Sequence, residues 1–266
     1  VVELYMVDFI AVAFDAVLNH IAKLEGFSGG KWKAPLVIRA PSGGGYGDGG
    51  QHGQSLWGTL ASIPGLTVVI ASTPADAYGL MTTALAHDGP VVFMEPKLLS
   101  EDWLEFLGSG GRDTVTFDVP AEGAVGPVPG TPYSTPFGKA AVRRDGGEVT
   151  IVSVAVGVHR ALEAAEKLHR SDVSCEVIDL RSLRPLDVET IVESVTKTGR
   201  LLVVDEDYRE FGMAGEMAAL CLEASLSPRY ARVCVEDTLP YARHLEDAAL
   251  PNVDRIVEAV NSLVDA

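Results

Sequence analysis

Short apolar, β-branched runs alternate with segments of helical periodicity along this chain, and that alternation restricts its fold more than any other feature. The runs LVIRA at 36–40 and TVVIA at 67–71 have the length and composition of buried strands. Residues 72–86 begin with hydroxyls, a proline and an acid, which together mark a helix start. Strands joined by helices through short connections form parallel sheets covered on both faces. We therefore expect an α/β fold.

The same alternation recurs after a break in the pattern. Strands are expected at 149–156, 175–180, 200–205 and 230–235, with helices at 159–169, 187–196, 211–224 and 253–264. The stretch 108–136 is rich in proline and glycine and has little periodicity, which is typical of a linker. A chain of 266 residues can form two domains with substantial cores. We predict two doubly wound domains at 1–107 and 137–266.

The charge and the cysteines limit the partners and the compartment. A formal net charge of −16 argues against nucleic acid or an anionic membrane as a partner. No apolar run approaches the roughly 18 residues that a membrane span needs. Three cysteines that are far apart and odd in number predict buried free thiols in a reducing compartment, the cytoplasm or an equivalent matrix. The opening VVELYMV resembles the middle of a strand and lacks an initial Met, so we expect further sequence ahead of Val1.

A glycine-rich segment from Gly43 to Gly53 follows the 36–40 strand and carries a single imidazole, His52. In open α/β sheets ligands lie beyond the carboxyl ends of the strands, and an imidazole titrates near neutral pH. The pattern GxGxxG at 45–50 would suit a dinucleotide, as in a nicotinamide-dependent dehydrogenase. In so glycine-rich a stretch that match is weak, and no clear helix opens after it.

The tripeptide GDG at 47–49 resembles the start of the metal and diphosphate motif of thiamine enzymes. That motif is completed by an Asn some two dozen residues later, and the asparagines of this chain are Asn19, Asn252 and Asn261. If a diphosphate binds here, another chain must hold it. The acids at 205–207 also end a strand, but a solvated run or a contact to a basic partner suits them at least as well. We assign no catalytic role to them or to Glu216.

The chain as a whole resembles the beta subunit of the decarboxylating component of 2-oxo acid dehydrogenase complexes. Several blocks agree with that family in order and spacing: VVELYMVDFIAVAFDAVLNHIAK, IRAP with the glycine-rich segment and QHGQS, IPGLTVVIASTPADAYGL, DGPVVFMEPK, SCEVIDLRSLRPLDVETIVESVTKTGRLLVVDE and LEDAALPNVDRIVEAV. The resemblance implies a transketolase-like pyrimidine-binding domain followed by a transketolase-type carboxy-terminal domain. It also implies an α2β2 heterotetramer in which the alpha subunit holds Mg²⁺ and the diphosphate of thiamine diphosphate.

The resemblance assigns roles to three side chains. By position Phe9 matches the aromatic residue that stacks on the aminopyrimidine ring, and Tyr5 lines the same pocket. His52 matches the active-site histidine, which orients the substrate and relays a proton as the acyl group passes to a lipoyl acyltransferase. From the residues alone, Phe9 fits a core residue better and His52 fits a structural loop histidine equally well. The family match favours the functional roles.

A potassium site is a further implication of the resemblance. Its ligands would be backbone carbonyl groups around Leu36, Val37, Ala84, His87 and Gly89. Hard oxygen ligands suit such a cation, although side-chain identity says nothing about a carbonyl site.

Two departures from the family pattern leave alternatives open. The glutamate that activates the cofactor lies upstream of Val1 in the family, and Glu3 occupies a different place. The chain is therefore either an amino-terminal truncation or a non-catalytic assembly subunit. The segment DEDYREFGMAGE also lacks the small residues that the family has before FG. The expected substrate is pyruvate or a branched-chain 2-oxo acid, and an acetoin-cleaving homologue is the alternative.

Overall fold

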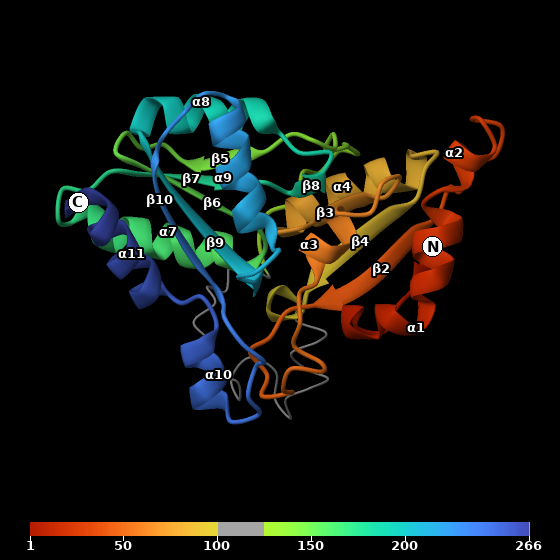
Figure 1. Ribbon diagram of the computed structural model, residues 1–266, viewed down its shortest axis with the longest axis horizontal. Coiled ribbons are helices and arrows are strands. Elements are labelled where there is room, and N and C mark those ends of the chain that lie inside the picture. The colour runs from red at the N-terminus through yellow and green to blue at the C-terminus, as the bar shows by residue number, and fades with distance from the viewer. Residues whose placement is uncertain (101–124, 266) are drawn as a thin grey trace.

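The protein, described here from a computed structural model that covers residues 1–100 and 125–265, contains two β-sheets flanked by helices (Figure 1). The first sheet has the order β1-β2-β4-β3-β8, with β1 to β4 parallel and β8 antiparallel to β3. Its strands are β1 (Val2–Glu3), β2 (Val37–Ser42), β3 (Thr67–Ile70), β4 (Val91–Pro96) and β8 (Ser182–Arg184). The second half of the chain thus supplies an edge strand to the first sheet.

The second sheet has the order β10-β9-β6-β7-β5 and is parallel except for the edge strand β5. Its strands are β5 (Ala141–Arg144), β6 (Val149–Ser153), β7 (Cys175–Asp179), β9 (Arg200–Tyr208) and β10 (Arg229–Val235). The predicted α/β class with two parallel sheets is confirmed. The edge strands β5 and β8 were not predicted, because each is short and carries arginine where a buried strand would be apolar.

The helices connect the strands much as expected. They are η1 (Val7–Phe9), α1 (Ile10–Asp15), η2 (Ala16–Ile21), α2 (Leu24–Phe27), α3 (Trp57–Ala61), α4 (Pro74–Ala86), η3 (Lys97–Leu99), α7 (Val156–His169), α8 (Val188–Thr198), α9 (Met213–Glu223), α10 (Arg243–Ala249) and α11 (Val253–Asp265). Helix α4 starts where the sequence predicts, because the Thr73 hydroxyl accepts a hydrogen bond from the Asp76 amide and Pro74 occupies the first turn. No helix among the described residues is long and apolar enough to cross a bilayer.

The amino-terminal segment differs from its prediction. A strand over residues 1–7 was expected, but β1 is only two residues long and Met6 has φ of 79°, which breaks the extended conformation. The Asp8 side chain does not cap the helical segment in which it lies. Its Oδ1 atom instead accepts hydrogen bonds from the amide and the side chain of Gln54, both at 3.1 Å. The start of this helix is therefore tied to the glycine-rich segment.

One apolar cluster spans both domains. It joins Ile70 and Met94 of the first sheet to Val152, Leu201 and Val203 of the second, and all five are buried. Figure 1 shows the first sheet on the right of the molecule and the second sheet on the left. Burial of apolar surface between them makes a stable interface, so the relative position of the domains is set by packing.

The acidic run at 205–207 is buried, so a solvated run, one of the alternatives left open for it, is wrong. It lies at the domain interface, where its side chains accept hydrogen bonds from the first domain. The indole of Trp57 donates to Asp205 at 2.8 Å, and the amide of Gly58 donates to Asp207 at 2.9 Å. Buried carboxylates need such donors, because leaving them unpaired costs several kcal/mol.

Most of the predicted linker at 108–136 falls on residues 101–124, which lie outside the described residues. The described part, residues 125–136, forms no helix or strand, and Thr135 within it contacts helix α4. The Thr135 amide donates to the carbonyl of Gly79, and the Thr83 hydroxyl donates to the carbonyl of Thr135. The exact domain boundaries stay a prediction.

Asp205 makes the stability of the protein depend on pH. Burial, helped by the charge of Asp207, raises its pKa from 3.8 to about 7. The folded state therefore binds more protons than the unfolded state between about pH 4 and pH 7, and the free energy of unfolding falls as the pH rises through this range. For one such group we expect a loss of about 1.4 kcal/mol between pH 6 and pH 8, measured by urea denaturation.

The control for this prediction is Asp205→Asn, whose side-chain oxygen can still accept from Trp57. Because an amide does not titrate, the difference between the two proteins gives the contribution of Asp205 together with its coupling to Asp207 and Glu206. Equal loss of stability in both proteins between pH 6 and pH 8 would contradict the prediction.

Candidate active site

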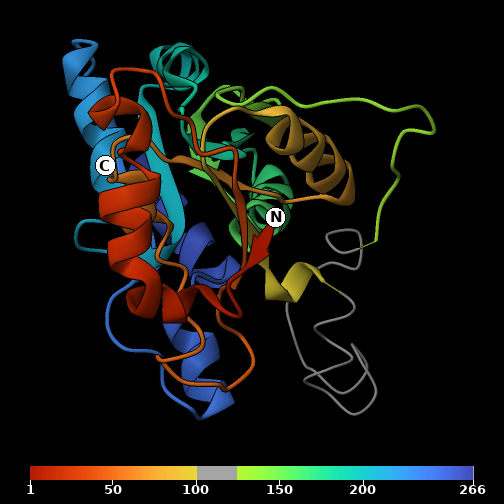
Figure 2. The same ribbon diagram turned by 90° about the vertical axis from the view of Figure 1, so that its right-hand side faces the viewer.

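The glycine-rich segment forms a closed loop at the carboxyl end of β2. We call residues 43–54 the glycine loop, because the Gly43 amide donates to the carbonyl of Gln54 at 3.0 Å and so joins its two ends. Strands β2 and β4 are parallel, so the loop and the residues after β4 meet at the same edge of the sheet. Figures 1 and 2 both show the loop beside α10 of the second domain.

A carboxylate of the second domain fills the glycine loop. Glu246, on α10, is fully buried and accepts hydrogen bonds from the amides of Gly45 at 2.9 Å and Gly47 at 2.6 Å. Both glycines have positive φ, 105° and 74°, which turns successive amides toward one anion. The protein's own carboxylate thus occupies the place that a phosphate would take, and the GxGxxG pattern needs no dinucleotide to explain it.

A buried lysine holds the loop at another point. Lys97 follows β4, and its ammonium donates a hydrogen bond to the backbone carbonyl of His52. It lies 3.9 Å from the carboxylate of Asp48 and 5.2 Å from the centre of the Tyr46 ring. Burial lowers the pKa of Lys97, while the charge of Asp48 opposes that shift. The sequence did not predict that Lys97 belongs to the site, because a lysine after a strand is normally exposed. Its position at the carboxyl end of β4, the edge where ligands bind in such sheets, was the signal that could have indicated it.

The structure brings Phe9 and His52 together. Their ring centroids are 5.5 Å apart and the ring planes meet at 73°, an edge-to-face contact. Phe9 is 41% exposed and His52 is partly buried, so the pair lies at an accessible surface. Tyr5, the third predicted residue, is 52% exposed on the segment that leads to Phe9. The bond from Gln54 to Asp8 fixes this segment against the glycine loop.

The positions expected to bind potassium lie at and just before the start of β2, at the end of α4 and in the turn before β4. The Leu36 carbonyl accepts a hydrogen bond from the Val91 amide at 2.8 Å, and the Ala84 carbonyl accepts one from the His87 amide at 3.3 Å. A carbonyl has two lone pairs, so each can take a second partner. Val37 pairs with Val91 of β4. His87 and Gly89 both line a cavity of about 480 Å³. The potassium site stays a prediction.

Two family profiles match this chain. The transketolase pyrimidine-binding domain matches residues 1–101, and the transketolase C-terminal domain matches residues 138–256. The acetoin:2,6-dichlorophenolindophenol oxidoreductase subunit beta of Cupriavidus necator is 38% identical over 97% of this chain and 71% of its own length. The pyruvate dehydrogenase E1 component subunit beta of Rickettsia conorii is 37% identical over 99% of this chain and 75% of its own.

The 2-oxoisovalerate dehydrogenase subunit beta of Bacillus subtilis is 34% identical over all of this chain and 76% of its own length. This chain belongs to the E1 beta-subunit family of 2-oxo acid dehydrogenases. It spans about three quarters of the length of these relatives. A solved structure described as "Split gene transketolase, inactive beta4 tetramer" shares the fold, with a TM-score of 0.76 and 21% identity over 99% of this chain and 75% of that one.

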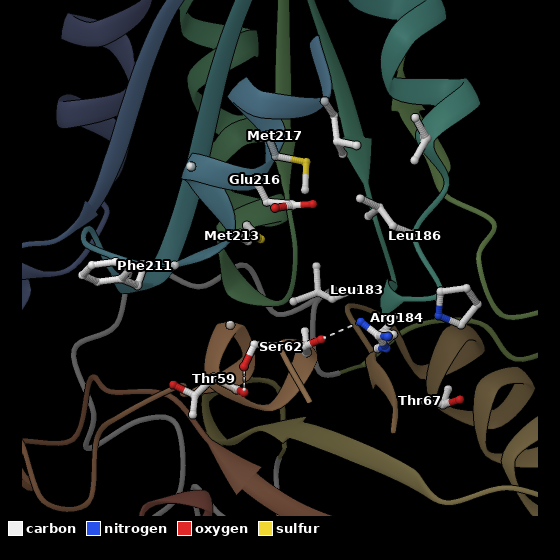
Figure 3. Close-up of a pocket in the computed structure, with 17 residues that line it drawn as sticks. Thr59, Ser62, Thr67, Leu183, Arg184, Leu186, Phe211, Met213, Glu216 and Met217 are labelled. Atoms are coloured by element: carbon white, nitrogen blue, oxygen red, sulfur yellow. Dashed lines mark hydrogen bonds between the residues drawn. The ribbon is translucent and has the colours of Figure 1, made fainter. Parts of the chain in front are cut away.

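A second, larger cavity lies away from the residues that the family match singles out. It has a volume of about 1120 Å³ and opens between α3 of the first domain and β8 and α9 of the second. Figure 3 shows Glu216 of α9 facing Thr59 and Ser62 of α3 across this space. Among the described residues, no group of three or more His, Cys, Asp or Glu side chains is placed to hold a metal ion.

Lys97 should contribute to the stability of the glycine loop. Lys97→Met keeps the apolar length of the side chain but leaves the His52 carbonyl without its ammonium donor. We expect the free energy of unfolding to fall by about 1 to 3 kcal/mol, the usual cost of an unsatisfied buried group. Urea denaturation measures this loss.

Lys33→Met is the matched control for this experiment. Lys33 pairs with Asp88 at 2.9 Å but is largely exposed, so its loss should change stability by less than about 0.5 kcal/mol. Equal stabilities of the two variants would show that the buried ammonium of Lys97 does not hold the loop.

Proposed function

We propose that this chain is a catalytic beta subunit that acts with an alpha subunit in the thiamine-diphosphate-dependent oxidative decarboxylation of a small 2-oxo acid, and that it passes the acyl group to a lipoyl acyltransferase. The observation that carries the proposal is the accessible contact between Phe9 and His52 at the carboxyl edge of the first sheet. Family membership supports the reaction class, and the position of the contact agrees with the ligand-binding edge of such sheets.

The residues present fit part of a thiamine diphosphate site. Phe9 and Tyr5 are exposed aromatic side chains that would hold the aminopyrimidine ring. The amides of Gly45 and Gly47 are already occupied by Glu246, so they offer no cradle for a diphosphate. This supports a shared site in which the alpha subunit of an α2β2 heterotetramer holds the diphosphate and Mg²⁺. When bound, the thiazolium ring of the cofactor supplies a carbanion and an electron sink.

The role proposed for His52 is to orient the substrate and move a proton at its imidazole. Its amide donates to the carbonyl of Gly49 at 3.2 Å, and its own carbonyl accepts from Lys97. Both backbone groups are therefore fixed, which places the imidazole beside Phe9, where the two rings make an edge-to-face contact. A proton-transfer group that is held in this way loses little entropy when the substrate binds.

Further parts of the proposal concern a cation and the compartment. The carbonyl groups at Leu36, Val37, Ala84, His87 and Gly89 are proposed to bind potassium. The three cysteines, Cys175, Cys221 and Cys234, are buried and free. Free thiols support a reducing compartment, so we propose the cytoplasm or a mitochondrial matrix.

Replacing His52 tests the proposal directly. In the complex with its alpha subunit and acyltransferase, His52→Ala should lower the overall rate about 10²- to 10⁴-fold, as expected for loss of a general acid–base group. Assembly, measured by size-exclusion chromatography, should be unchanged. His20→Ala is the control, because His20 is exposed and pairs only with Asp15 in the described structure. Full activity in His52→Ala would remove this residue from the mechanism.

Product analysis separates the substrates. With pyruvate or a branched-chain 2-oxo acid we expect release of CO₂ and an acylated lipoyl group. Cleavage of acetoin without CO₂ would favour the acetoin-cleaving alternative, which the near-equal identities of the relatives do not favour over 2-oxo acids. Correct assembly with neither reaction, and with no binding of thiamine diphosphate, would favour a non-catalytic assembly subunit.

A further inference from the structure

One side chain of the second domain binds two backbone amides of the glycine loop. Glu246 lies 201 residues after Gly45 and 199 after Gly47, yet it accepts a hydrogen bond from each amide. Bonds from an amide to an ionised carboxylate are stronger than neutral ones, and two of them fix the orientation of the loop as well as its position. Glu246 and the Gly45 amide are buried, so water does not compete for that bond, and the Gly47 bond is part-buried.

Glu246 and Lys97 hold the loop at different points. Lys97 belongs to the first domain and contacts the His52 carbonyl, while Glu246 belongs to the second and contacts the amides of Gly45 and Gly47. The loop ends are joined between Gly43 and Gln54, so a displacement of its first half is transmitted to His52 in its second half. The opposite charges of Glu246 and Lys97 also attract across the loop, since Glu246 is one of the groups that raise the pKa of Lys97 against its burial.

We propose that Glu246 is a positioning residue, which clamps the glycine loop to the second domain and thereby holds the His52 imidazole against Phe9. The consequence for catalysis rests on the proposed function, whereas the clamp itself does not. Because Glu246 lies on α10, the second domain takes part in ordering the active site. The glycines at 45 and 47 let the Glu246 carboxylate approach the backbone closely. Loss of this carboxylate should therefore make the loop more mobile.

Hydrogen exchange tests the clamp without reference to activity. Glu246→Gln keeps the shape of the side chain, but its NH₂ group cannot accept a hydrogen bond, so one glycine amide loses its acceptor. In the assembled complex we expect the amides of residues 43–54 to exchange about tenfold faster or more, while those of β6 and β9 keep their protection. Glu246→Asp keeps the charge with a shorter reach, and its loop should exchange at an intermediate rate.

Glu176→Gln is the matched control. Glu176 is also a buried carboxylate of the second domain, but it pairs with Lys197 and lies on β7, far along the chain from α10. Its substitution should leave exchange in the glycine loop unchanged. Wild-type exchange rates in the loop of both Glu246 variants would overturn the proposal. If Glu246→Gln fails to fold, the Glu246→Asp protein decides by the same measurement.

Kinetics then test the consequence for His52. In Glu246→Gln we expect kcat to fall about tenfold or more, with KM for the 2-oxo acid changed by less than about threefold, because a misplaced catalytic group affects the transition state more than substrate binding. Faster loop exchange with unchanged kcat would overturn the positioning role. If the wild-type complex decarboxylates no 2-oxo acid, the proposed function fails, and hydrogen exchange still decides whether the clamp exists.

Discussion

The structure depends on buried carboxylates of the second domain that satisfy donors of the first. Asp205 accepts from the Trp57 indole, Asp207 from the Gly58 amide, and Glu246 from two amides of the glycine loop. A buried carboxylate without donors costs several kcal/mol, so a shift between the domains that broke these bonds would be strongly unfavourable. Apolar packing holds the domains together, and the hydrogen bonds of the carboxylates fix the position of one domain relative to the other.

These contacts lie on both sides of the candidate site. Glu246 holds the beginning of the glycine loop, whereas Asp205 and Asp207 hold the residues that immediately follow it. His52 lies between these attachments, in contact with Phe9 of the first domain. The position of its imidazole therefore depends on contacts from both domains. A first domain without the second would lack the acceptors that order the loop.

Local sequence signals predicted most of the fold, and long-range contacts account for what was missed. The β-branched runs gave the central strands, and the Thr73 cap with Pro74 gave the start of α4, because each signal acts within a few residues. Strand β8 and helix α10 were missed because they are stabilised by contacts far along the chain. The burial of Lys97 and Glu246 was missed for the same reason. His52 and Phe9 came from the family resemblance, since the residues alone left their roles open.

The buried carboxylates also make the formal net charge a poor measure of the electric field around the protein. The formal value of −16 counts 37 acidic residues as fully ionised and gives each the same weight. Asp205, with a pKa raised to about 7 by burial, is only partly ionised at neutral pH, and Glu206 forms an internal pair with Arg160 at 2.6 Å. The field outside the protein comes mainly from the exposed acids, because buried pairs largely cancel. Attraction to any basic partner surface would therefore act mainly through the exposed acids, and salt would screen it over a Debye length of about 8 Å at physiological ionic strength.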